Sequence, residues 1–562
     1  MSLHAPPIHH RPPRVLVVGA GVGGLTAAAL LARSGVEVQL IERAGAPGGK
    51  VCQVELGAAV TDGLADRAAD RVADRVVSRV GATTTPPDPP RLDGGPTVLT
   101  MRWVFDSLFE RLGQSLDQHL VLRRCEVLAR HAWGPDERLD LSADLETSVA
   151  AIAAFSGGAQ ARRYRDFCEH ARAIYQTLEG PFMRGSRPTP GSLAWRVWRQ
   201  QGPSGLRQLL RISPFTPLWQ ALGRYFPDPR LRQLFGRYAT YCGSSPFEAP
   251  ATLMLVAHVE RDAVWQVEGG LFRLAQALAS CAQQQGVRLH YGCEARQLLM
   301  ERGRVNGVEL QDGRRLAADA VLFNGDAQAL SSGLLGLPVQ QALGAPPRAV
   351  RSLSALTWHL QAEAGGFELS HHNVFFGPSA AYRAEFEALA QGRLPDQPTV
   401  YVCAQDRSGR ALPAGPRPGA AERLMCLVNA PATADQRALT EPEIARCEEQ
   451  MWTQLSRAGL RLKAGTHTPV RTLPQDFAQR FPATGGALYG PASQGWRASF
   501  NARPDGRTAV PGLFLAGGSV HPGPGVPMAA LSGQRAAEQI CVALHSTSRW
   551  PAARMPGGMS MR

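Results

Sequence analysis

Three glycines near the start of the chain have the spacing of a phosphate-binding turn. Gly19, Gly21 and Gly24 follow the β-branched run at residues 14–18 and precede an alanine- and leucine-rich stretch. In a dinucleotide-binding fold the first glycine permits a tight turn, the second lets a pyrophosphate approach the backbone, and the third lets the helix pack on the strand. Glu42 follows 18 residues after the third glycine, where a carboxylate accepts hydrogen bonds from ribose hydroxyls. The alternative is an ordinary βαβ unit with a glycine-rich turn.

A second glycine pair lies shortly after Glu42 and has a cation on each side. Arg43 precedes Gly48 and Gly49, and Lys50 follows them. A glycine pair followed by a cation suits a loop folded over a bound, extended FAD, with Arg43 and Lys50 facing phosphate or ribose oxygens. The alternative is a surface turn with two solvated cations.

A third glycine signature lies near the end of the chain. The apolar run 512–516 leads into Gly517 and Gly518, and Pro527 opens a helical pattern that continues to residue 540. Proline suits the first turn of a helix, and the free amides of that turn favour an anion. If that anion is the N1/O2 edge of a reduced flavin, the arrangement favours hydride acceptance at flavin N5. The glycines at the two ends of the chain thus predict a flavin-dependent oxidoreductase.

His521 is the one candidate for a catalytic acid or base, because it lies between the C-terminal glycines and the predicted helix. Flanked by proline, it also suits a structural hydrogen-bonding role, which we favour. The catalytic assignment is otherwise left open.

Composition excludes several classes of protein. The chain has 562 residues, 44% of them apolar and 19% charged, so it can form large packed cores. A small disulfide scaffold, a collagen and a wholly disordered chain are excluded. Ten cysteines are scattered without a CxxC pair or a metal-ligand spacing. They predict reduced, mostly buried thiols and no metal site.

Taken together, the motifs resemble those of the bacterial phytoene-desaturase-type carotenoid desaturases. The likeness covers most of the chain and rests on the glycine fingerprint with Glu42 and on the segments 47–50, 93–100, 267–274, 318–326 and 517–527. Within that family, residues 101–106, 518–521 and 528–533 look most like the hydroxyneurosporene (methoxyneurosporene) dehydrogenases of purple bacteria, which are 1-hydroxycarotenoid 3,4-desaturases.

The resemblance implies a reaction and further flavin contacts. The reaction removes two hydrogens from a 1-hydroxylated acyclic carotenoid, with FAD as cofactor, and forms the 3,4 double bond. Phytoene desaturases, carotenoid ketolases, flavin-dependent carotenoid isomerases and a non-catalytic lipid-binding flavoprotein are the alternatives. The contacts that the resemblance adds are Gly95, Pro96, Thr97, Ala295, Val526 and Met528, with Ala295 acting through its backbone at the adenine end.

The electron acceptor is inferred from a motif that the sequence lacks. No second GxGxxG occurs, so no site for a bound nicotinamide cofactor is visible. Both this observation and the resemblance imply that oxygen or a membrane quinone reoxidises the flavin.

An α/β fold with α+β inserts must position these motifs, and its flavin domain must be discontinuous because its signatures lie at opposite ends of the chain. We expect a Rossmann-like FAD-binding domain, as in amine-oxidase and glutathione-reductase-like flavoproteins, with a substrate domain and a helical lid. Its middle part should contain a helix at 271–285, strands at 287–291 and 321–323, and a hairpin turning at Asp312-Gly313. The predicted division assigns 1–56, 91–124, 267–329 and 479–545 to the FAD-binding domain, 57–90 to an insertion, 125–266 to the helical lid and membrane-facing segment, 330–478 to the substrate domain and 546–562 to a flexible tail.

Residues 57–90 are extra sequence relative to the family. They contain a four-residue repeat of the type Ala-Asp-Arg-Val, followed by a proline-rich linker. On a helix this period places Asp and Arg in adjoining stripes. We interpret the insertion as a surface excursion without chemistry. The alternative is that it displaces Gly95 and Pro96 from the flavin and leaves the protein inactive.

The net charge of +13 is concentrated in one region. Residues 181–240 contain ten arginines and one acidic residue, Asp228, together with tryptophans and other aromatic residues. Arginine beside tryptophan on helices suits a peripheral membrane contact, where cations meet anionic lipid. A solvated arginine-rich face is the alternative, and the spacing does not match a nucleic-acid-binding module.

The expected location follows from the apolar runs. None approaches the ~18 residues that a spanning helix needs, and residues 1–13 lack the apolar stretch of a signal peptide. We expect a cytoplasmic protein that associates peripherally with the inner, photosynthetic membrane, where a lipophilic carotenoid resides. The sequence leaves the oligomeric state open.

Overall fold

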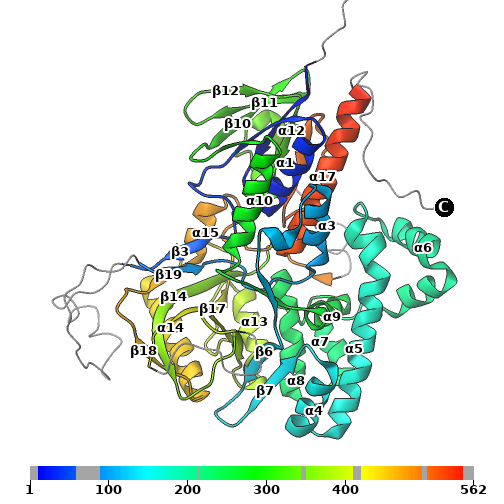
Figure 1. The fold of residues 1–562 in the computed structure, drawn as a ribbon. Helices are drawn as coiled ribbons and strands as arrows, with labels where there is room; N and C mark the ends of the chain where they lie inside the picture. Colours follow the sequence, from blue (N-terminus) through cyan, green and yellow to red (C-terminus); the bar gives the residue numbers. More distant parts are fainter. Residues whose placement is uncertain are drawn as a thin grey trace, which may run out of the picture.

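The computed structural model describes residues 11–57, 89–212, 215–343, 350–408, 419–495 and 503–547. Most of the predicted insertion, residues 58–88, and the tail after residue 547 lie outside these described residues. Figure 1 shows three regions: a parallel sheet with its helices, a larger mixed sheet below it, and a group of helices beside the mixed sheet.

The parallel sheet is assembled from distant parts of the chain. Its strand order is β20-β13-β1-β2-β9, and every neighbouring pair is parallel. These strands are β20 (Leu513–Leu515), β13 (Ala320–Phe323), β1 (Arg14–Val18), β2 (Glu37–Ile41) and β9 (Arg288–His290). The strands predicted at 14–18, 287–291 and 321–323 are confirmed, and the sheet is a discontinuous Rossmann-like unit.

Helices with small residues at their contacts cover this sheet. They are α1 (Val22–Arg33), α10 (Phe272–Gln284) and α17 (Val526–Thr547). α1 and α17 approach closely, because a Cβ atom on Gly533 would lie 2.2 Å from the carbonyl oxygen of Gly23. α3 (Trp103–Arg111) packs on α17 and buries Phe105 and Phe109 in the same core. Helix α17 continues past residue 545, where the sequence analysis ends the flavin domain.

A small antiparallel sheet extends the parallel sheet. It consists of β10 (Ala295–Glu301), β11 (Arg304–Leu310) and β12 (Arg315–Ala317), with α11 (Ala327–Ser331) and α12 (Leu337–Leu343) following β13. The Leu310 amide donates a hydrogen bond to the Arg314 carbonyl at 2.9 Å, across the turn between β11 and β12. The predicted hairpin with its turn at residues 312–313 is therefore confirmed.

The mixed sheet has eight strands in the order β18-β14-β17-β16-β15-β6-β7, with β19 also paired to β14. The strands are β18 (Arg461–Ala464), β14 (Ser354–Gly365), β17 (Glu422–Ala430), β16 (Val400–Ala404), β15 (His372–Phe375), β6 (Val127–Ala132), β7 (Arg138–Ser142) and β19 (Val470–Thr472). One face packs against α14 (Glu441–Arg457) through Trp358, Cys426 and Met451. The cross-strand register places polar side chains together on the opposite face, here called the polar face: Thr357, His359, His372, Tyr401 and Cys403.

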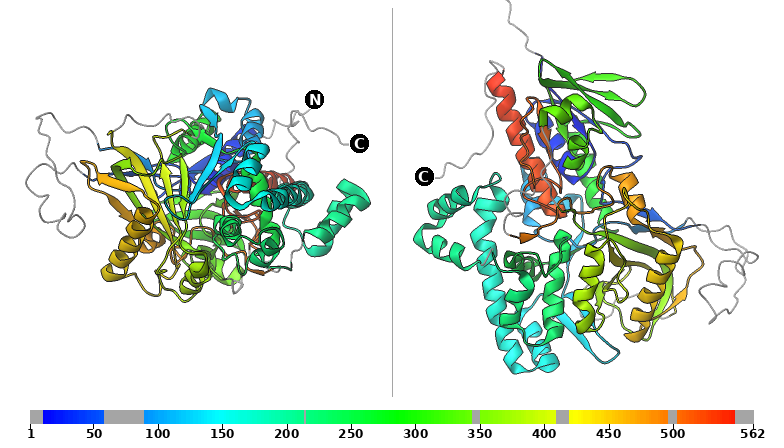
Figure 2. Two further views of the ribbon diagram at one scale, coloured as in Figure 1. Left: turned by 90° about the horizontal axis from the view of Figure 1, so that it is seen from below. Right: turned by 180° about the vertical axis from the view of Figure 1, so that it is seen from behind.

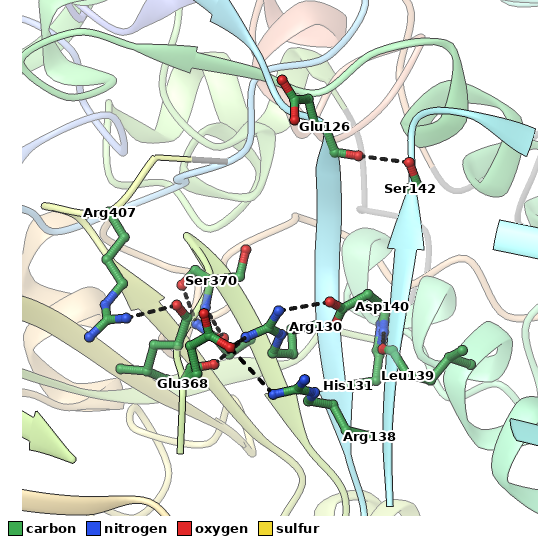
Figure 3. A network of polar contacts seen from close by, with 12 residues as sticks. Glu126, Arg130, His131, Arg138, Leu139, Asp140, Ser142, Glu368, Ser370 and Arg407 are labelled. Carbon is green, nitrogen blue, oxygen red and sulfur yellow. Dashed lines mark hydrogen bonds and ion pairs between the residues drawn. The ribbon is translucent and has the colours of Figure 1, made fainter. Parts of the chain in front are cut away.

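Strands β6 and β7 differ from the predicted division, which places them in the helical segment 125–266. β6 pairs in parallel with β15, so residues 127–142 belong to the mixed sheet. Arg130 of β6 donates to both carboxylate oxygens of Asp140 on β7, at 2.9 and 2.8 Å, and also to the Glu368 carbonyl oxygen. Figure 3 shows these contacts joining the edge of the sheet to the segment before β15. The difference arises because β15, the parallel partner of β6, lies more than 200 residues later in the chain.

Helices occupy most of the chain between β7 and β8, as Figure 2 shows from two further sides. They form a second core around Phe167, Phe226 and Phe235. The helices are α4 (Leu145–Ser156), α5 (Gly158–Leu178), a π-helical turn (Glu179–Arg184), α6 (Pro190–Arg211), α7 (Leu218–Tyr225), α8 (Pro229–Gly236), 3-10 turns at Arg237–Cys242 and Ala251–Met254, and α9 (Leu255–Asp262).

Short elements connect the regions. β3 (Gln53–Glu55) pairs with β4 (Arg91–Asp93), and β5 (Leu122–Arg124) pairs with β8 (Trp265–Val267). The remaining pieces are the 3-10 turns Leu116–Gln118 and Ser379–Ala381 and the helices α13 (Tyr382–Ala390) and α15 (Pro474–Arg480).

Candidate flavin site

The N-terminal glycines form a turn that has no room for side chains at these positions. Gly19 has φ +105°, and a Cβ atom on Gly24 would lie 2.2 Å from the Gly19 carbonyl oxygen. A Cβ atom on Gly21 would lie 2.8 Å from Asn324 Nδ2. Gly21 is the N-cap of α1, and the described chain supplies no side-chain cap there. The free amides at this helix end suit a phosphate group, as the sequence predicts.

Glu42 ends β2 beside this turn. Its two carboxylate oxygens accept hydrogen bonds from the amides of Ala20, at 2.7 Å, and Ala44, at 2.8 Å. Each oxygen retains a second lone pair, so the carboxylate can also accept from ribose hydroxyls. The amide of Cys293 donates to the Glu42 carbonyl at 2.8 Å, which brings the segment leading to Ala295 to the end of the turn expected to hold the adenosine.

The second glycine pair packs directly on the first turn. The Gly48 amide donates to the Ala20 carbonyl at 2.8 Å, and a Cβ atom on Gly49 would lie 3.3 Å from Gly21 Cα. A Cβ atom on Gly95 would lie 1.8 Å from the Lys50 carbonyl oxygen. Three glycine segments thus meet in one cradle lined by backbone. This cradle fits the pyrophosphate and ribityl part of FAD, which needs close backbone approach.

Lys50 and Arg43 differ in their surroundings. The Lys50 ammonium donates to the Leu488 carbonyl and lies 5.2 Å from the centre of the Phe481 ring. Burial lowers the pKa of Lys50, and Asp326 opposes that shift. Arg43 points outward and pairs with Glu294 at 3.7 Å, with both side chains more than 40% exposed. The structure therefore buries the Lys50 ammonium against Leu488 and Phe481 and leaves Arg43 exposed, which agrees with the alternative interpretation of Arg43 as a solvated cation.

The C-terminal signature adjoins the same cradle. Gly517 has φ +115°, its amide donates to Ser532 Oγ at 3.2 Å, and α17 begins nine residues later at Val526. Pro527 and Met528 lie in the first turn of α17. This helix end has its free amides and its positive dipole end where the sequence predicts them.

Asn324 is a site residue that the sequence analysis missed. It follows β13, and its Nδ2 donates to the Gly19 carbonyl at 3.2 Å. Its Oδ1 lies beside Gly23 and Gly517 and is buried without a hydrogen-bond partner within the described ranges. Asn324 thus joins the N-terminal and C-terminal glycines. The position just after a central strand of a parallel sheet was the available signal.

His521 is buried and engaged with backbone groups. Its Nε2 lies 2.9 Å from the Phe182 carbonyl oxygen and 3.2 Å from that of Gly185. Burial lowers the pKa of His521 to about 4, and nearby Arg535 adds to the shift. The ring is therefore neutral at pH 7 and donates from Nε2 to a carbonyl. This geometry supports the structural role and ties the π-helical turn to the C-terminal signature.

Residues 93–97 pass between the glycine cradle and the mixed sheet. Asp93 accepts hydrogen bonds from the amides of Leu271, at 2.5 Å, and Phe272, at 3.1 Å. Burial raises the pKa of Asp93, and these two amides oppose the shift. Gln405 exchanges two hydrogen bonds with the Asp93 backbone, at 2.9 and 3.0 Å. These contacts fix Gly95, Pro96 and Thr97 over the polar face of the sheet.

A cavity of about 330 Å³ borders this segment on the side of the mixed sheet. Its lining is rich in arginine and carboxylate side chains, and includes Thr97, His371 and Cys403. The fingerprint glycines do not line it, so it is distinct from the FAD cradle.

Comparison with known proteins bears on this arrangement. The family model described as flavin containing amine oxidoreductase matches residues 92–541, and the model of an NAD(P)-binding Rossmann-like domain matches residues 17–74. The chain belongs to the flavin containing amine oxidoreductases. This membership and the glycine cradle together identify the protein as an FAD-dependent oxidoreductase.

Individual relatives of this flavin containing amine oxidoreductase match almost its whole length. It is 48% identical over 551 residues to the hydroxyneurosporene desaturase of Rubrivivax gelatinosus, covering 98% of this chain and 97% of that protein. It is 43% identical over 537 residues to the hydroxyneurosporene desaturase of Cereibacter sphaeroides, covering 96% and 99%. These relatives confirm the predicted resemblance to carotenoid desaturases.

Solved structures share the fold. Putrescine oxidase superposes with a TM-score of 0.56 at 16% identity, covering 95% of this chain and 99% of that one. Cyclohexylamine oxidase from Brevibacterium oxydans gives a TM-score of 0.52 at 13% identity, covering 95% and 100%. They confirm the predicted amine-oxidase-like architecture.

Proposed function

We propose that this protein is an FAD-dependent carotenoid desaturase that removes two hydrogens from a 1-hydroxylated acyclic carotenoid and forms the 3,4 double bond. The observation that carries the proposal is the identity of 43–48% over nearly the full length of two hydroxyneurosporene desaturases. The glycine cradle would hold the flavin, and residues 93–97 join this cradle to the polar face of the mixed sheet. This arrangement is compatible with a substrate bound between the two regions.

The proposed reaction mainly requires that the substrate is aligned with the flavin. Bound FAD would accept a hydride at N5, while a proton leaves the adjacent carbon. The conjugated chain of the substrate stabilises positive charge, so the protein must hold one C–H bond close to the flavin and exclude water. The glycine cradle and the α17 amides would hold the cofactor, and Lys50 would place a positive charge beside it. His521 donates from Nε2 to a carbonyl and is not assigned the proton.

The acceptor and the location belong to the same proposal. Oxygen or a membrane quinone would take the electrons from the reduced cofactor, and the protein would act at the cytoplasmic face of the inner membrane. Among the described helices, none is both long and apolar enough to cross a bilayer. A peripheral contact is therefore the form of membrane association that we propose.

The proposed contact is an exposed surface on α6, here called the α6 patch: Trp195, Trp198, Arg199, Arg207 and Leu210. Trp195 and Trp198 are 54% and 53% exposed, and Leu210 is 85% exposed. Helix α6 is bent at Gly202 and stands at the periphery of the molecule (Figure 1). Tryptophan rings at headgroup depth and arginines over anionic lipid would bind the protein to a membrane.

Three other arginines of segment 181–240 are engaged with the rest of the protein. Arg196 donates to the Ser186 carbonyl at 2.6 Å, Arg230 pairs with Asp228 at 2.8 Å, and Arg237 is only 7% exposed. The proposed membrane contact is assigned to the α6 patch, which does not include them. Sedimentation with anionic vesicles at low salt tests it: Trp195→Ser/Trp198→Ser and Arg199→Gln/Arg207→Gln should each reduce binding several-fold. The control Arg457→Gln/Arg461→Gln, on the α14 side, should not, and equal binding of all variants would contradict the assignment.

Expression in a host that makes neurosporene, with and without its 1-hydroxylated derivative, tests the activity. We expect a red-shifted pigment that has lost two hydrogens, formed only from the hydroxylated compound. Consumption of phytoene would instead indicate a phytoene desaturase, gain of oxygen a ketolase, and unchanged mass with a changed spectrum an isomerase. FAD binding with every carotenoid unchanged would indicate a lipid-binding flavoprotein.

A further inference from the structure

Three side chains form a hydrogen-bonded chain between the flavin segment and the mixed sheet. Thr97 Oγ1 lies 2.7 Å from the Tyr401 hydroxyl, and that hydroxyl lies 2.7 Å from His372 Nδ1. The three residues come from the loop after β4, from β16 and from β15. Thr97 and Tyr401 are 304 residues apart in the chain, so the contact depends on the docking of the two regions.

The protonation states leave Thr97 with a hydrogen-bonding position that a ligand can use. Burial lowers the pKa of His372 well below its usual value and raises that of Tyr401 well above its own, so both are neutral. If His372 Nδ1 donates, Tyr401 donates to Thr97, whose own hydrogen is then available to a ligand or to the neighbouring Cys403 thiol. If His372 Nδ1 accepts, Thr97 donates to Tyr401 and keeps a lone pair for a ligand. In either direction Thr97 Oγ1 is the end of the chain at which a ligand can compete with the weakly hydrogen-bonding thiol.

Thr97 is placed beside the expected flavin and beside open space. It follows Gly95, whose Cα approaches the Lys50 carbonyl in the glycine cradle. It also lines the cavity of about 330 Å³ on the side of the mixed sheet. Thr97 is therefore near both the cradle and a space that protein atoms do not fill.

The proposed substrate has a hydroxyl close to its reacting carbons, so a polar side chain near the flavin could recognise it. The molecule is a hydrocarbon except for one tertiary hydroxyl on C1, and desaturation begins at C3, two bonds away. A group that recognises the hydroxyl must therefore lie beside the reacting carbons and the flavin. A site that hydrogen-bonds a substrate hydroxyl discriminates strongly against a substrate without one.

We propose that Thr97 Oγ1 binds the C1 hydroxyl of the substrate and that Tyr401 and His372 position it. This inference rests on the proposed function, because it specifies the group by which the protein would recognise the proposed substrate. The chain can match the hydroxyl as donor or as acceptor by reversing its two internal hydrogen bonds.

The neighbouring His371 and Cys403 do not change this assignment. Their ligand atoms and those of His372 lie within 4.8 Å of one another, which is a spacing that could suit a metal. However, His371 Nδ1 lies 3.0 Å from the Ala404 carbonyl and 2.9 Å from that of Arg407. Burial raises the pKa of Cys403 to about 12, so the thiol is protonated, whereas a metal ligand is a thiolate.

The test compares 1-hydroxyneurosporene with neurosporene in detergent micelles, using the purified FAD-loaded protein. Dissociation constants come from quenching of flavin fluorescence, and kcat/KM comes from product absorbance. In Thr97→Val we expect the dissociation constant of the hydroxylated compound to rise about 10- to 100-fold and its kcat/KM to fall by a similar factor, while the dissociation constant of neurosporene changes far less. Thr97→Ser should restore most of the selectivity, and Tyr401→Phe should lose part of it.

Tyr382→Phe is the matched control. The Tyr382 hydroxyl is buried in the helical core and has no hydrogen-bond partner in the part of the chain that the structure describes. Its removal should leave the selectivity ratio unchanged. Flavin content and melting temperature of each variant establish that it is folded.

Two results would overturn the inference: wild-type protein that binds both carotenoids equally, or Thr97→Val protein that keeps the wild-type ratio. Failure of the proposed function is a separate result. In that case the wild-type protein converts neither compound, and the binding ratio of wild type and Thr97→Val still decides the role of Thr97.

Discussion

His521 illustrates how burial selects one of the roles open to a histidine. The ring is 3% exposed, it lies edge-on to Phe182, and its Nε2 faces two backbone carbonyls. A neutral imidazole suits this setting, because protonation would bury a charge near Arg535. The residue therefore joins the π-helical turn Glu179–Arg184 to the C-terminal glycine signature.

This setting predicts a pH-dependent stability. The pKa of His521 is lowered from 6.5 to about 4 in the folded protein, so between these values the unfolded chain binds more protons. The free energy of unfolding should therefore fall as pH falls through this window, by up to about 3 kcal/mol from this residue. Urea unfolding at pH 7 and pH 5 measures the change.

The variant His521→Gln should lose that pH dependence and keep carotenoid turnover at pH 7, because the Gln amide can donate to the same carbonyls. A general base at this position would instead make the variant inactive with FAD bound. An unchanged pH dependence of unfolding in the variant would contradict the assigned cause.

At the scale of elements, the glycine loops show how backbone approach builds the cofactor cradle. Gly48 has φ +113°, and a Cβ atom there would lie 2.0 Å from the Val51 carbonyl oxygen. We expect Gly48→Ala to lose FAD during purification, since the loop must move away from Gly21. The ratio of flavin absorbance at 450 nm to protein absorbance measures the loss.

Gly45 supplies the control for this change, because it lies in the same loop with no atom within 4 Å of a Cβ position. Gly45→Ala should keep full flavin content. Equal flavin content in both alanine variants would show that the close packing at Gly48 is not needed for cofactor binding.

Strand β6 and the edge strand β7 depend on Arg130, which is paired with Asp140 and with Glu368 (Figure 3). Arg130→Met would leave the partly buried Asp140 carboxylate without its cation. We expect a loss of about 2 kcal/mol in the free energy of unfolding, with unchanged flavin content. Urea unfolding followed by far-UV circular dichroism measures it.

The matched change Arg446→Met removes an ion pair whose two side chains are 67% exposed, so it should have a much smaller effect. If both variants lose equal stability, the burial of the Arg130 pair is not the cause.

The sequence predicted the elements whose signals are local. The strand 14–18, the fingerprint glycines and the hairpin at 312–313 each have their pattern within a few residues. The position of β6 was missed because its parallel partner, β15, is distant in the chain. The outward direction of Arg43 and the contact of Thr97 with Tyr401 likewise depend on tertiary packing between distant segments, which local sequence patterns do not reveal.

At the scale of the whole molecule, the FAD cradle is built from parts of the chain that are far apart in sequence. Strands from the beginning, the middle and the end of the chain meet in the parallel sheet. A ligand that binds only the folded state stabilises it by mass action, by about 4 kcal/mol at a thousand times its dissociation constant. Removal of FAD should therefore lower the melting temperature by several degrees.

Differential scanning calorimetry of apoprotein with increasing FAD measures this shift. The melting temperature should rise with FAD concentration and should not rise with NAD. A melting temperature independent of FAD would contradict the assignment of the glycine cradle.

The close packing of α17 on α1 also has a consequence for biosynthesis. Gly533 fits against the Gly23 carbonyl, so the first helix made by the ribosome has its partner among the last. At the usual ~5–20 residues per second, translation of this chain takes roughly half a minute to two minutes. During that time the apolar surface of α1 has no α17 to cover it. The nascent chain must therefore protect this helix, with a chaperone or with its own later segments, until the C-terminal helix leaves the ribosome.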